Sequence, residues 1–140
     1  VRGIVIKDKK LLVFKLHPEA TFYSLPGGRL EFGETIYEGI QREILEETGI
    51  KPVVGKLLLV NQLIQNDRHR VEFFFFIENA NDFEKIDLSK ASHGFEVVSF
   101  EFTDIKDGVI QIKPDFLKDI VKEIIEKGID NFSFRILTSH

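Results

Sequence analysis

The amino-acid sequence contains no cysteine, and it contains no long apolar run. Without cysteine, the chain forms no disulfide, uses no thiolate nucleophile and holds no zinc through sulfur. A membrane-spanning helix needs about eighteen or more consecutive apolar residues, and no such stretch exists. The N-terminal VRGIVIKDKK also lacks the basic, apolar and small-residue regions of a signal peptide. We therefore expect a cytoplasmic protein without a membrane segment.

An excess of basic charge is missing as well, because the net charge is -4. Binding along a nucleic-acid backbone draws its affinity from clustered Lys and Arg, so the composition argues against nucleic acid as a partner. An acidic site that faces phosphates would repel them unless divalent cations lie between. The chain does have ample apolar material, with 14 Phe among 140 residues. We expect one domain that spans residues 1–140.

Apolar runs separated by turn residues predict strands, with two helices between and after them. Strands are expected at residues 3–7, 11–16, 53–65, 70–78 and 95–102, the first two as a hairpin and the next two joined by a turn at 66–69. A helix follows Thr35 and stops at Gly49, and a second lies within 113–128. The last segment, 129–140, is either an edge strand or a homodimer contact. This order indicates an α/β or α+β fold with a mixed sheet covered by helices.

Acidic residues crowd into one stretch, residues 28–50. It holds six glutamates against two arginines, the glutamates being Glu31, Glu34, Glu38, Glu43, Glu46 and Glu47. Helical geometry places Glu43, Glu46 and Glu47 in one sector, while Ile40 and Ile44 form a neighbouring apolar stripe that can pack on a sheet. Three carboxylates therefore point the same way on a helix whose other face is anchored.

A solvated helix face is the simplest explanation of such a run, because exposed Glu is common. A solvated face would gain stability by placing Lys four residues after Glu, and this helix carries only Arg42 as a cation. Divalent cations would turn the repulsion into coordination, because hard ions such as Mg²⁺ select carboxylate oxygens and join them to phosphates. Arg42 can pair with Glu46 and hold its orientation, or it forms a surface ion pair of little value.

These residues resemble the signature of the Nudix hydrolases. That motif is Gly, five residues, Glu, seven residues, Arg-Glu, an apolar residue, one residue, Glu-Glu, one residue, Gly and an apolar residue. Every spacing is met by Gly28, Glu34, Arg42, Glu43, Ile44, Glu46, Glu47, Gly49 and Ile50. The preceding LPGG and Glu31 are also similar to the family. The resemblance implies an α/β/α sandwich with a mixed central sheet, and a box at residues 28–50 that carries the chemistry.

The resemblance implies hydrolysis of the pyrophosphate linkage in a nucleoside diphosphate joined to another group, with Mg²⁺ or Mn²⁺ as cofactor. Carried over by position, Glu43 and Glu47 become the principal metal ligands and Glu46 a further ligand or the base that activates water. Glu34 becomes a supporting acid and Arg42 the residue that orients the glutamates. Gly28 belongs to a loop whose backbone carbonyls reach the metal, including that of Gly27.

Residues outside the box are weaker candidates. A further carboxylate often serves as base or ligand in the family, and Glu96 is our candidate, with Glu101 behind it; an exposed strand residue is the alternative. Arg70 and His69, near a loop, could contact phosphates, although solvated loop residues explain them as well. Tyr23 could stack on a nucleobase, but aromatic rings fill cores more often. For His17 and His93 we expect no partner.

By elimination, the chain looks like a MutT-type enzyme acting on nucleoside triphosphates or nucleotide sugars. The ADP-ribose and dinucleoside polyphosphate subfamilies are associated with a Pro or a Tyr about sixteen residues beyond the box. In this chain the residues at those positions are Gln65 and Asn66. A catalytically silent nucleotide-binding regulatory domain is one alternative, although the intact carboxylates disfavour it. An RNA 5'-end pyrophosphohydrolase is another, and the acidic balance disfavours that.

Overall fold

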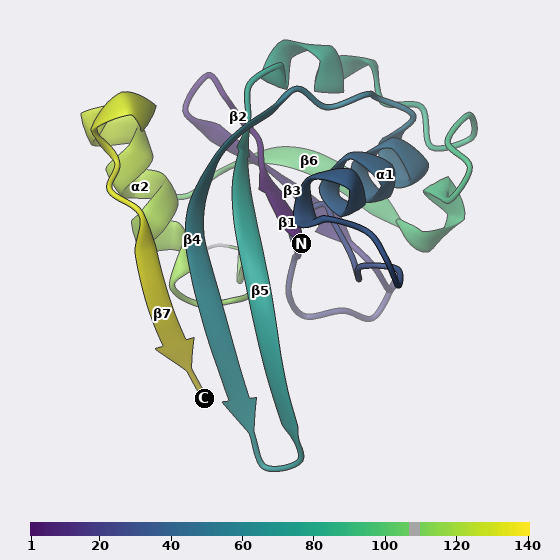
Figure 1. Ribbon diagram of the computed structural model, residues 1–140. Helices are drawn as coiled ribbons and strands as arrows, with labels where there is room; N and C mark the ends of the chain where they lie inside the picture. Colours follow the sequence, from purple (N-terminus) through teal and green to yellow (C-terminus); the bar gives the residue numbers. More distant parts are fainter. Residues whose placement is uncertain (107–109) are drawn as a thin grey trace.

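The computed structural model describes residues 1–106 and 110–140, which form two β-sheets with two α-helices (Figure 1). The strands are β1 (Arg2–Ile4), β2 (Ile6–Lys7), β3 (Lys10–Lys15), β4 (Val54–Gln65), β5 (Arg68–Ile77), β6 (Ser99–Asp104) and β7 (Arg135–Ser139). The α-helices are α1 (Ile36–Thr48) and α2 (Leu117–Lys127), and the short 3-10 helices are η1 (Ala80–Lys85), η2 (Gly94–Glu96) and η3 (Ile129–Asn131).

The larger sheet is mixed and has the strand order β1-β5-β4-β7. β4 and β5 form a long antiparallel hairpin, whereas β1 runs parallel to β5 and β7 runs parallel to β4. Figure 1 shows the far end of this hairpin reaching well beyond both helices. The smaller sheet is antiparallel, with the order β2-β3-β6. The expectation of a mixed sheet is confirmed.

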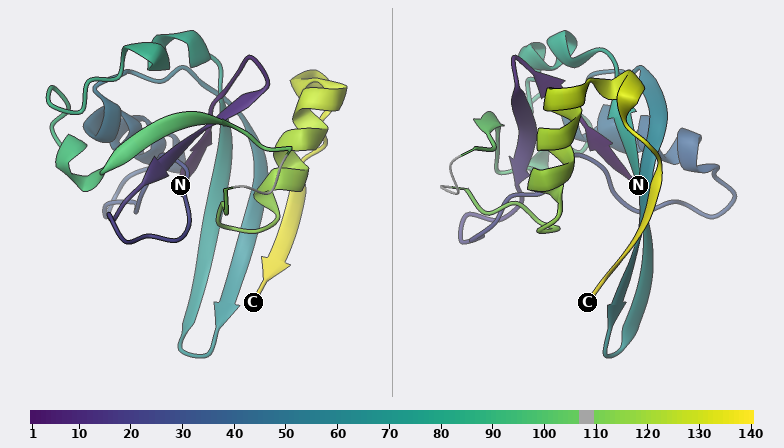
Figure 2. Two further views of the ribbon diagram at one scale, coloured as in Figure 1. Left: turned by 180° about the vertical axis from the view of Figure 1, so that it is seen from behind. Right: turned by 90° about the vertical axis from the view of Figure 1, so that its left-hand side faces the viewer.

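The helices cover opposite faces of the larger sheet, as the right-hand view of Figure 2 shows. Neighbouring Phe residues on β5 point to opposite faces because side chains alternate along a strand. Phe75 packs in the same buried cluster as Ile40 and Ile44 of α1, while Phe74 lies in the cluster that contains α2 and faces the ring of Phe116 at 5.8 Å. The α/β/α sandwich is therefore confirmed.

The expected strand 3–7 is divided between the two sheets. Its first part is β1, in the larger sheet, and its second part is β2, which forms the expected hairpin with β3. The hairpin turns at Asp8 and Lys9, both with positive φ (50° and 62°), as a two-residue type I′ turn requires. The fully buried Val5 lies between the two parts. The prediction of one continuous strand at 3–7 was wrong.

Two further expectations shift position. The strand expected at 95–102 begins only at Ser99, because Gly94–Glu96 form the 3-10 helix η2. The turn of the β4–β5 hairpin comprises residues 66–67 rather than 66–69. The final segment supplies β7, so the edge-strand alternative is confirmed. Among the helices in the described part of the chain, none is both long and apolar enough to span a membrane.

Candidate active site

Helix α1 is fixed at both ends and along one face. Thr35 caps its start through a capping box: its Oγ1 accepts from the N–H of Glu38 at 3.2 Å, and the Glu38 carboxylate accepts from the N–H of Thr35 at 2.8 Å. Gly49 ends the helix at φ 72°, in the left-handed conformation that suits glycine. Ile40 and Ile44 are completely buried against the sheet. These contacts fix the helix rotationally and set where its acidic face points.

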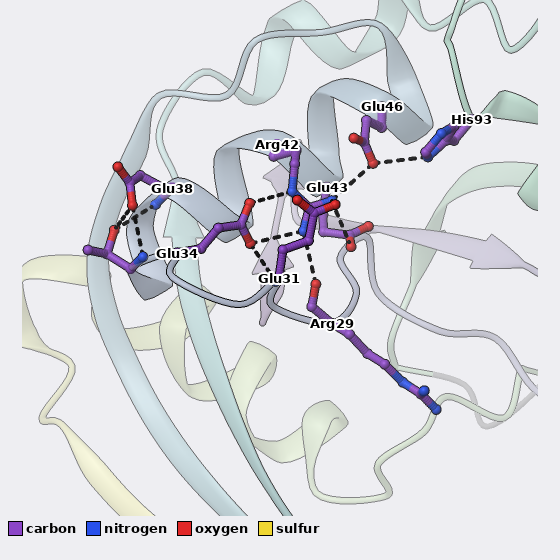
Figure 3. Close-up of polar contacts among 9 residues, drawn as sticks. Arg29, Glu31, Glu34, Glu38, Arg42, Glu43, Glu46 and His93 are labelled. Carbon is purple, nitrogen blue, oxygen red and sulfur yellow. Dashed lines mark hydrogen bonds and ion pairs between the residues drawn. The ribbon is translucent and has the colours of Figure 1, made fainter.

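Arg42 is the hub of the acidic cluster (Figure 3). Its guanidinium donates two hydrogen bonds to Glu34, at 2.5 and 3.1 Å, and single hydrogen bonds to Glu43 at 3.2 Å and Glu46 at 3.1 Å. It also donates to the backbone carbonyl of Arg29 at 3.0 Å. Arg42 therefore ties the helix to the loop before it and holds the side chains of Glu34, Glu43 and Glu46, while its role in catalysis stays a prediction.

The pKa of Glu34 is lowered to about 2, first by the hydrogen bond from Arg42 and then by a backbone N–H from Glu31. This carboxylate stays ionised and holds Arg42 in place, which fits the supporting role expected for Glu34. One guanidinium meets four carboxylates here, those of Glu31, Glu34, Glu43 and Glu46, so acidic groups outnumber the single cation at their centre.

Glu47 lies on the inner side of α1 and is only 4% exposed. Burial raises its pKa to about 8, and the negative charges of Glu43 and Glu96 act in the same direction. The N–H of Gly27, which donates to Glu47 Oε1 at 2.8 Å, opposes the shift without offsetting it. Glu47 is therefore a buried acid whose ionisation the protein alone disfavours, and it lies within electrostatic reach of two other acids.

The two box glycines lie against these acids. A Cβ on Gly28 would stand 2.4 to 2.6 Å from the carboxyl atoms of Glu43, so any other residue would push that side chain away. Gly27 has φ 137°, which disfavours any other residue, and its N–H holds Glu47. The loop and the helix face are therefore in direct contact, and the expected approach of the Gly27 carbonyl to a metal stays a prediction.

His93 is a site residue that sequence reasoning missed. Its Nδ1 lies 2.9 Å from Oε2 of Glu46, and its backbone N–H donates to the carbonyl of Glu46 at 2.7 Å. The prediction that His93 has no partner was wrong. The contact joins residues 47 positions apart, so no helical or strand periodicity could have indicated it. Glu96 follows in η2, which packs against α1 and brings Glu96 near Glu47.

The carboxylates around α1 are the candidate ligands for the divalent cation that the family implies. In residues 1–106 and 110–140, no three acidic or histidine side chains are grouped closely enough to hold a metal as they stand. Glu43 and Glu46 instead turn toward Arg42, and Glu47 turns toward Gly27. The chemistry nevertheless fits, because Mg²⁺ binds through one or two carboxylates with waters, and a cation would relieve the repulsion around the buried Glu47.

A cleft of about 650 Å³ lies between the larger sheet and the segment that leads into α2. It adjoins the glycine loop, because Arg2 and Leu25 line the cleft and Arg2 forms a β-bridge with Gly27. Arg70 lines it, in keeping with a contact to ligand phosphates. Tyr23 does not: its ring packs against the core beneath, and the neighbouring Phe22 lines the cleft instead. The stacking role expected for Tyr23 therefore lacks geometric support.

Comparison with known proteins agrees with this geometry. The model of the NUDIX domain family matches residues 1–122, and the chain belongs to that family. Over 82 residues it is 40% identical to an ADP-ribose pyrophosphatase of Methanocaldococcus jannaschii, a match that covers 56% of this chain and 48% of that one. Over 58 residues it is 43% identical to a MutT-like protein of Streptomyces ambofaciens, covering 41% of this chain and 37% of that one. The chain thus matches half or less of each relative's length.

Solved structures agree on the fold. A UDP-X diphosphatase superposes with a TM-score of 0.71 at 20% identity, covering 97% of this chain and 64% of that one. A MutT NUDIX hydrolase from Burkholderia pseudomallei superposes with a TM-score of 0.66 at 22% identity, covering 87% of this chain and 92% of that one. That the domain extends over all of residues 1–140 stays a prediction.

Proposed function

We propose that this protein hydrolyses the pyrophosphate linkage of a nucleoside diphosphate joined to another group, with Mg²⁺ or Mn²⁺ as cofactor. Nucleoside triphosphates and nucleotide sugars are the substrate classes that we favour. The observation that carries the proposal is the buried Glu47, whose ionisation is disfavoured by burial, Glu43 and Glu96, beside a glycine loop that opens toward a cleft. A divalent cation with a diphosphate would complete this arrangement.

The relatives support the reaction class. One is named for ADP-ribose and one structure for UDP-X, and both of these names describe a diphosphate that joins a nucleoside to a second group. Because the name of one relative is ADP-ribose pyrophosphatase, ADP-ribose belongs in any substrate panel, even though the residues at 65 and 66 do not carry the mark associated with that subfamily.

Within the site, Glu43 and Glu47 would hold the cation, with Glu46 and the carbonyl of Gly27 as further ligands. When bound, the cation polarises a phosphoryl oxygen and lowers the pKa of bound water. Arg42 and His93 fix the Glu46 carboxylate from two sides, and the Gly27 N–H fixes Glu47.

Glu96, in η2, lies opposite the helix face and can take the proton of the attacking water, which is the role that we propose for it. Two cations at the rim of the cleft, Arg70 and Lys113, can neutralise substrate phosphates. The apolar rings of Phe22, Phe74 and Phe116 line the same cleft and can receive a nucleobase.

The test is release of phosphate or pyrophosphate from a panel of nucleoside triphosphates, nucleotide sugars and ADP-ribose with Mg²⁺. Glu47→Gln should lower kcat at least about a hundredfold, because it removes a ligand and leaves the fold intact. Glu126→Gln, an exposed change on α2, is the matched control and should leave turnover unchanged. Unchanged turnover by Glu47→Gln would refute the assigned role. Binding without turnover by the native chain would favour a regulatory domain.

A further inference from the structure

A polar pair lies on the central strands of the larger sheet, and one member of the pair, Glu72, lines the cleft. Asn61 of β4 and Glu72 of β5 are directly opposite each other, and they are 0% and 9% exposed. The Asn61 Nδ2 donates to Glu72 Oε2 at 3.1 Å and to the Ser139 hydroxyl of β7 at 2.9 Å. The Ser139 hydroxyl donates back to Asn61 Oδ1 at 3.2 Å. Both N–H groups of the Asn61 amide are therefore used.

Glu72 is left with fewer partners than a carboxylate needs. A carboxylate accepts several hydrogen bonds, and a nearly buried one is unfavourable without them. Over the described ranges 1–106 and 110–140, Glu72 forms no ion pair, and the one side-chain donor to it is Asn61. In those ranges, every fully buried polar side-chain atom has a hydrogen-bond partner. The second oxygen of Glu72 has none, so it is not fully buried and is accessible from the cleft that Glu72 lines. It can accept N–H groups from whatever occupies the cleft.

The surroundings of Glu72 suit a flat aromatic ligand. Phe74, the next residue of the same face of β5, lines the cleft together with Phe22 and Phe116, so a nucleobase would lie between apolar rings with its edge toward Glu72. The accessible oxygen of Glu72 can accept two hydrogen bonds, so the edge that matches it carries two adjacent N–H donors. Guanine presents such an edge at N1 and its 2-amino group.

Other common bases do not match. Adenine and cytosine place a ring lone pair beside their amino group, and uracil places its single N–H between two carbonyls. Each would turn an unshared lone pair toward the carboxylate, which is unfavourable in a site of low solvent access. We propose that Glu72 selects the base and that the cleft accepts a guanine-type base, an inference that rests on the proposed function for the placement of the nucleotide.

Equilibrium binding tests this selection without turnover. The experiment is calorimetry with GMP, IMP and AMP in the presence of a chelator. The base of GMP offers two adjacent N–H donors, that of IMP offers one, and that of AMP offers a donor beside a ring lone pair. The native chain should bind GMP at least about tenfold more tightly than AMP, with IMP between them, because each lost N–H removes one hydrogen bond to the accessible oxygen of Glu72. Equal affinities, or no binding of GMP at millimolar concentration, would overturn the inference.

Glu72→Gln makes the test sharper. Asn61 Nδ2 would hold the glutamine oxygen, so the glutamine NH₂ would face the cleft and oppose the guanine N–H groups while donating to adenine N1. GMP affinity should fall at least about tenfold and the GMP/AMP ratio should drop toward or below one, a change that loss of folding cannot mimic. Glu72→Asp keeps the charge and should retain the order GMP, IMP, AMP. Glu126→Gln should change nothing, and an unaltered ratio in Glu72→Gln refutes the role.

The two proposals fail in different ways. If the native chain selects GMP but hydrolyses no nucleotide, the proposed function is wrong and the base selection stands. If it hydrolyses GTP and ATP with equal kcat/KM and Glu72→Gln leaves that ratio unchanged, the enzyme assignment stands and the base selection is wrong.

Discussion

Replacing Glu47 by Gln should stabilise the metal-free protein, although the same change removes a proposed metal ligand. Burial raises the pKa of Glu47 from 4.5 to about 8, so the folded state binds this proton more tightly than the unfolded chain does. The contribution of this proton to the stability of the folded state is therefore fully present below about pH 4.5. It is lost progressively as the pH rises to about 8. Glutamine carries no charge, and its amide oxygen can still accept the N–H of Gly27.

The magnitude follows from the interval between the two pKa values. Each pKa unit corresponds to about 1.4 kcal/mol, so the raised pKa of Glu47 lowers the free energy of unfolding by about 3 kcal/mol at pH 7 and about 4 kcal/mol near pH 8, because the unfolded chain ionises there while the folded chain must keep the proton. For a chain of this size, about 3 kcal/mol corresponds to a rise in Tm of roughly 10 °C. The measurement is thermal and urea unfolding of the native protein and Glu47→Gln from about pH 5 to pH 8, with a chelator and with Glu126→Gln as the control.

Magnesium supplies the second arm of this experiment. A cation that binds the folded state raises its stability by mass action, and the gain should be largest at high pH, where the ligands are ionised. Millimolar Mg²⁺ should stabilise the native protein and have a much smaller effect on Glu47→Gln. If the variant and the native protein show the same pH dependence of unfolding in chelator, the pKa of Glu47 is not raised by burial and the reasoning is refuted.

Three further changes test separate parts of the site. Gly28→Ala should lower metal affinity and kcat/KM at least about tenfold, because its Cβ would meet the Glu43 carboxyl. The control Gly33→Ala, whose Cβ would have nothing within 4 Å, should only strain the loop. Calorimetry and steady-state kinetics of the two variants check this prediction. Arg42→Lys should lower kcat about 10- to 100-fold with little change in Tm, because Lys cannot reproduce the forked hydrogen bonds. Thr35→Ala should reduce the free energy of unfolding by about 1 kcal/mol in urea titrations, through loss of the helix cap.

Helix α1 could be predicted almost residue by residue because its signals are local. The Thr35 cap, the Glu38 side chain that returns to it and the Gly49 stop all lie within one turn of the helix ends. The stripe of Ile40 and Ile44 then fixes which way the acidic face points. Short-range geometry thus indicated the shared face of Glu43, Glu46 and Glu47, whereas the roles proposed for them come from the resemblance to the family.

The parts that sequence reasoning missed depend on long-range packing. An apolar run such as residues 3–7 does not say which sheet it joins, and the division between β1 and β2 follows from pairing with Phe74 on one side and Leu11 on the other. Which of the neighbouring rings Phe22 and Tyr23 lines the cleft also depends on packing, because Tyr23 packs against the core while Phe22 lines the cleft. Neither choice is encoded in local propensity.

The same physical argument connects the two proposals. Arg42 neutralises part of the acidic helix and Asn61 satisfies one oxygen of Glu72, whereas Glu47 and the second oxygen of Glu72 are left to other donors. Burial makes the ionised form of Glu47 unfavourable in the folded chain, and the accessible oxygen of Glu72 has no side-chain donor among the described residues. The groups that fit the two positions differ in kind: a divalent cation suits the crowded acids around Glu47, and paired N–H donors suit the accessible oxygen of Glu72 beside the ring of Phe74. A guanine nucleotide bound with Mg²⁺ carries both, one at each end of the same molecule.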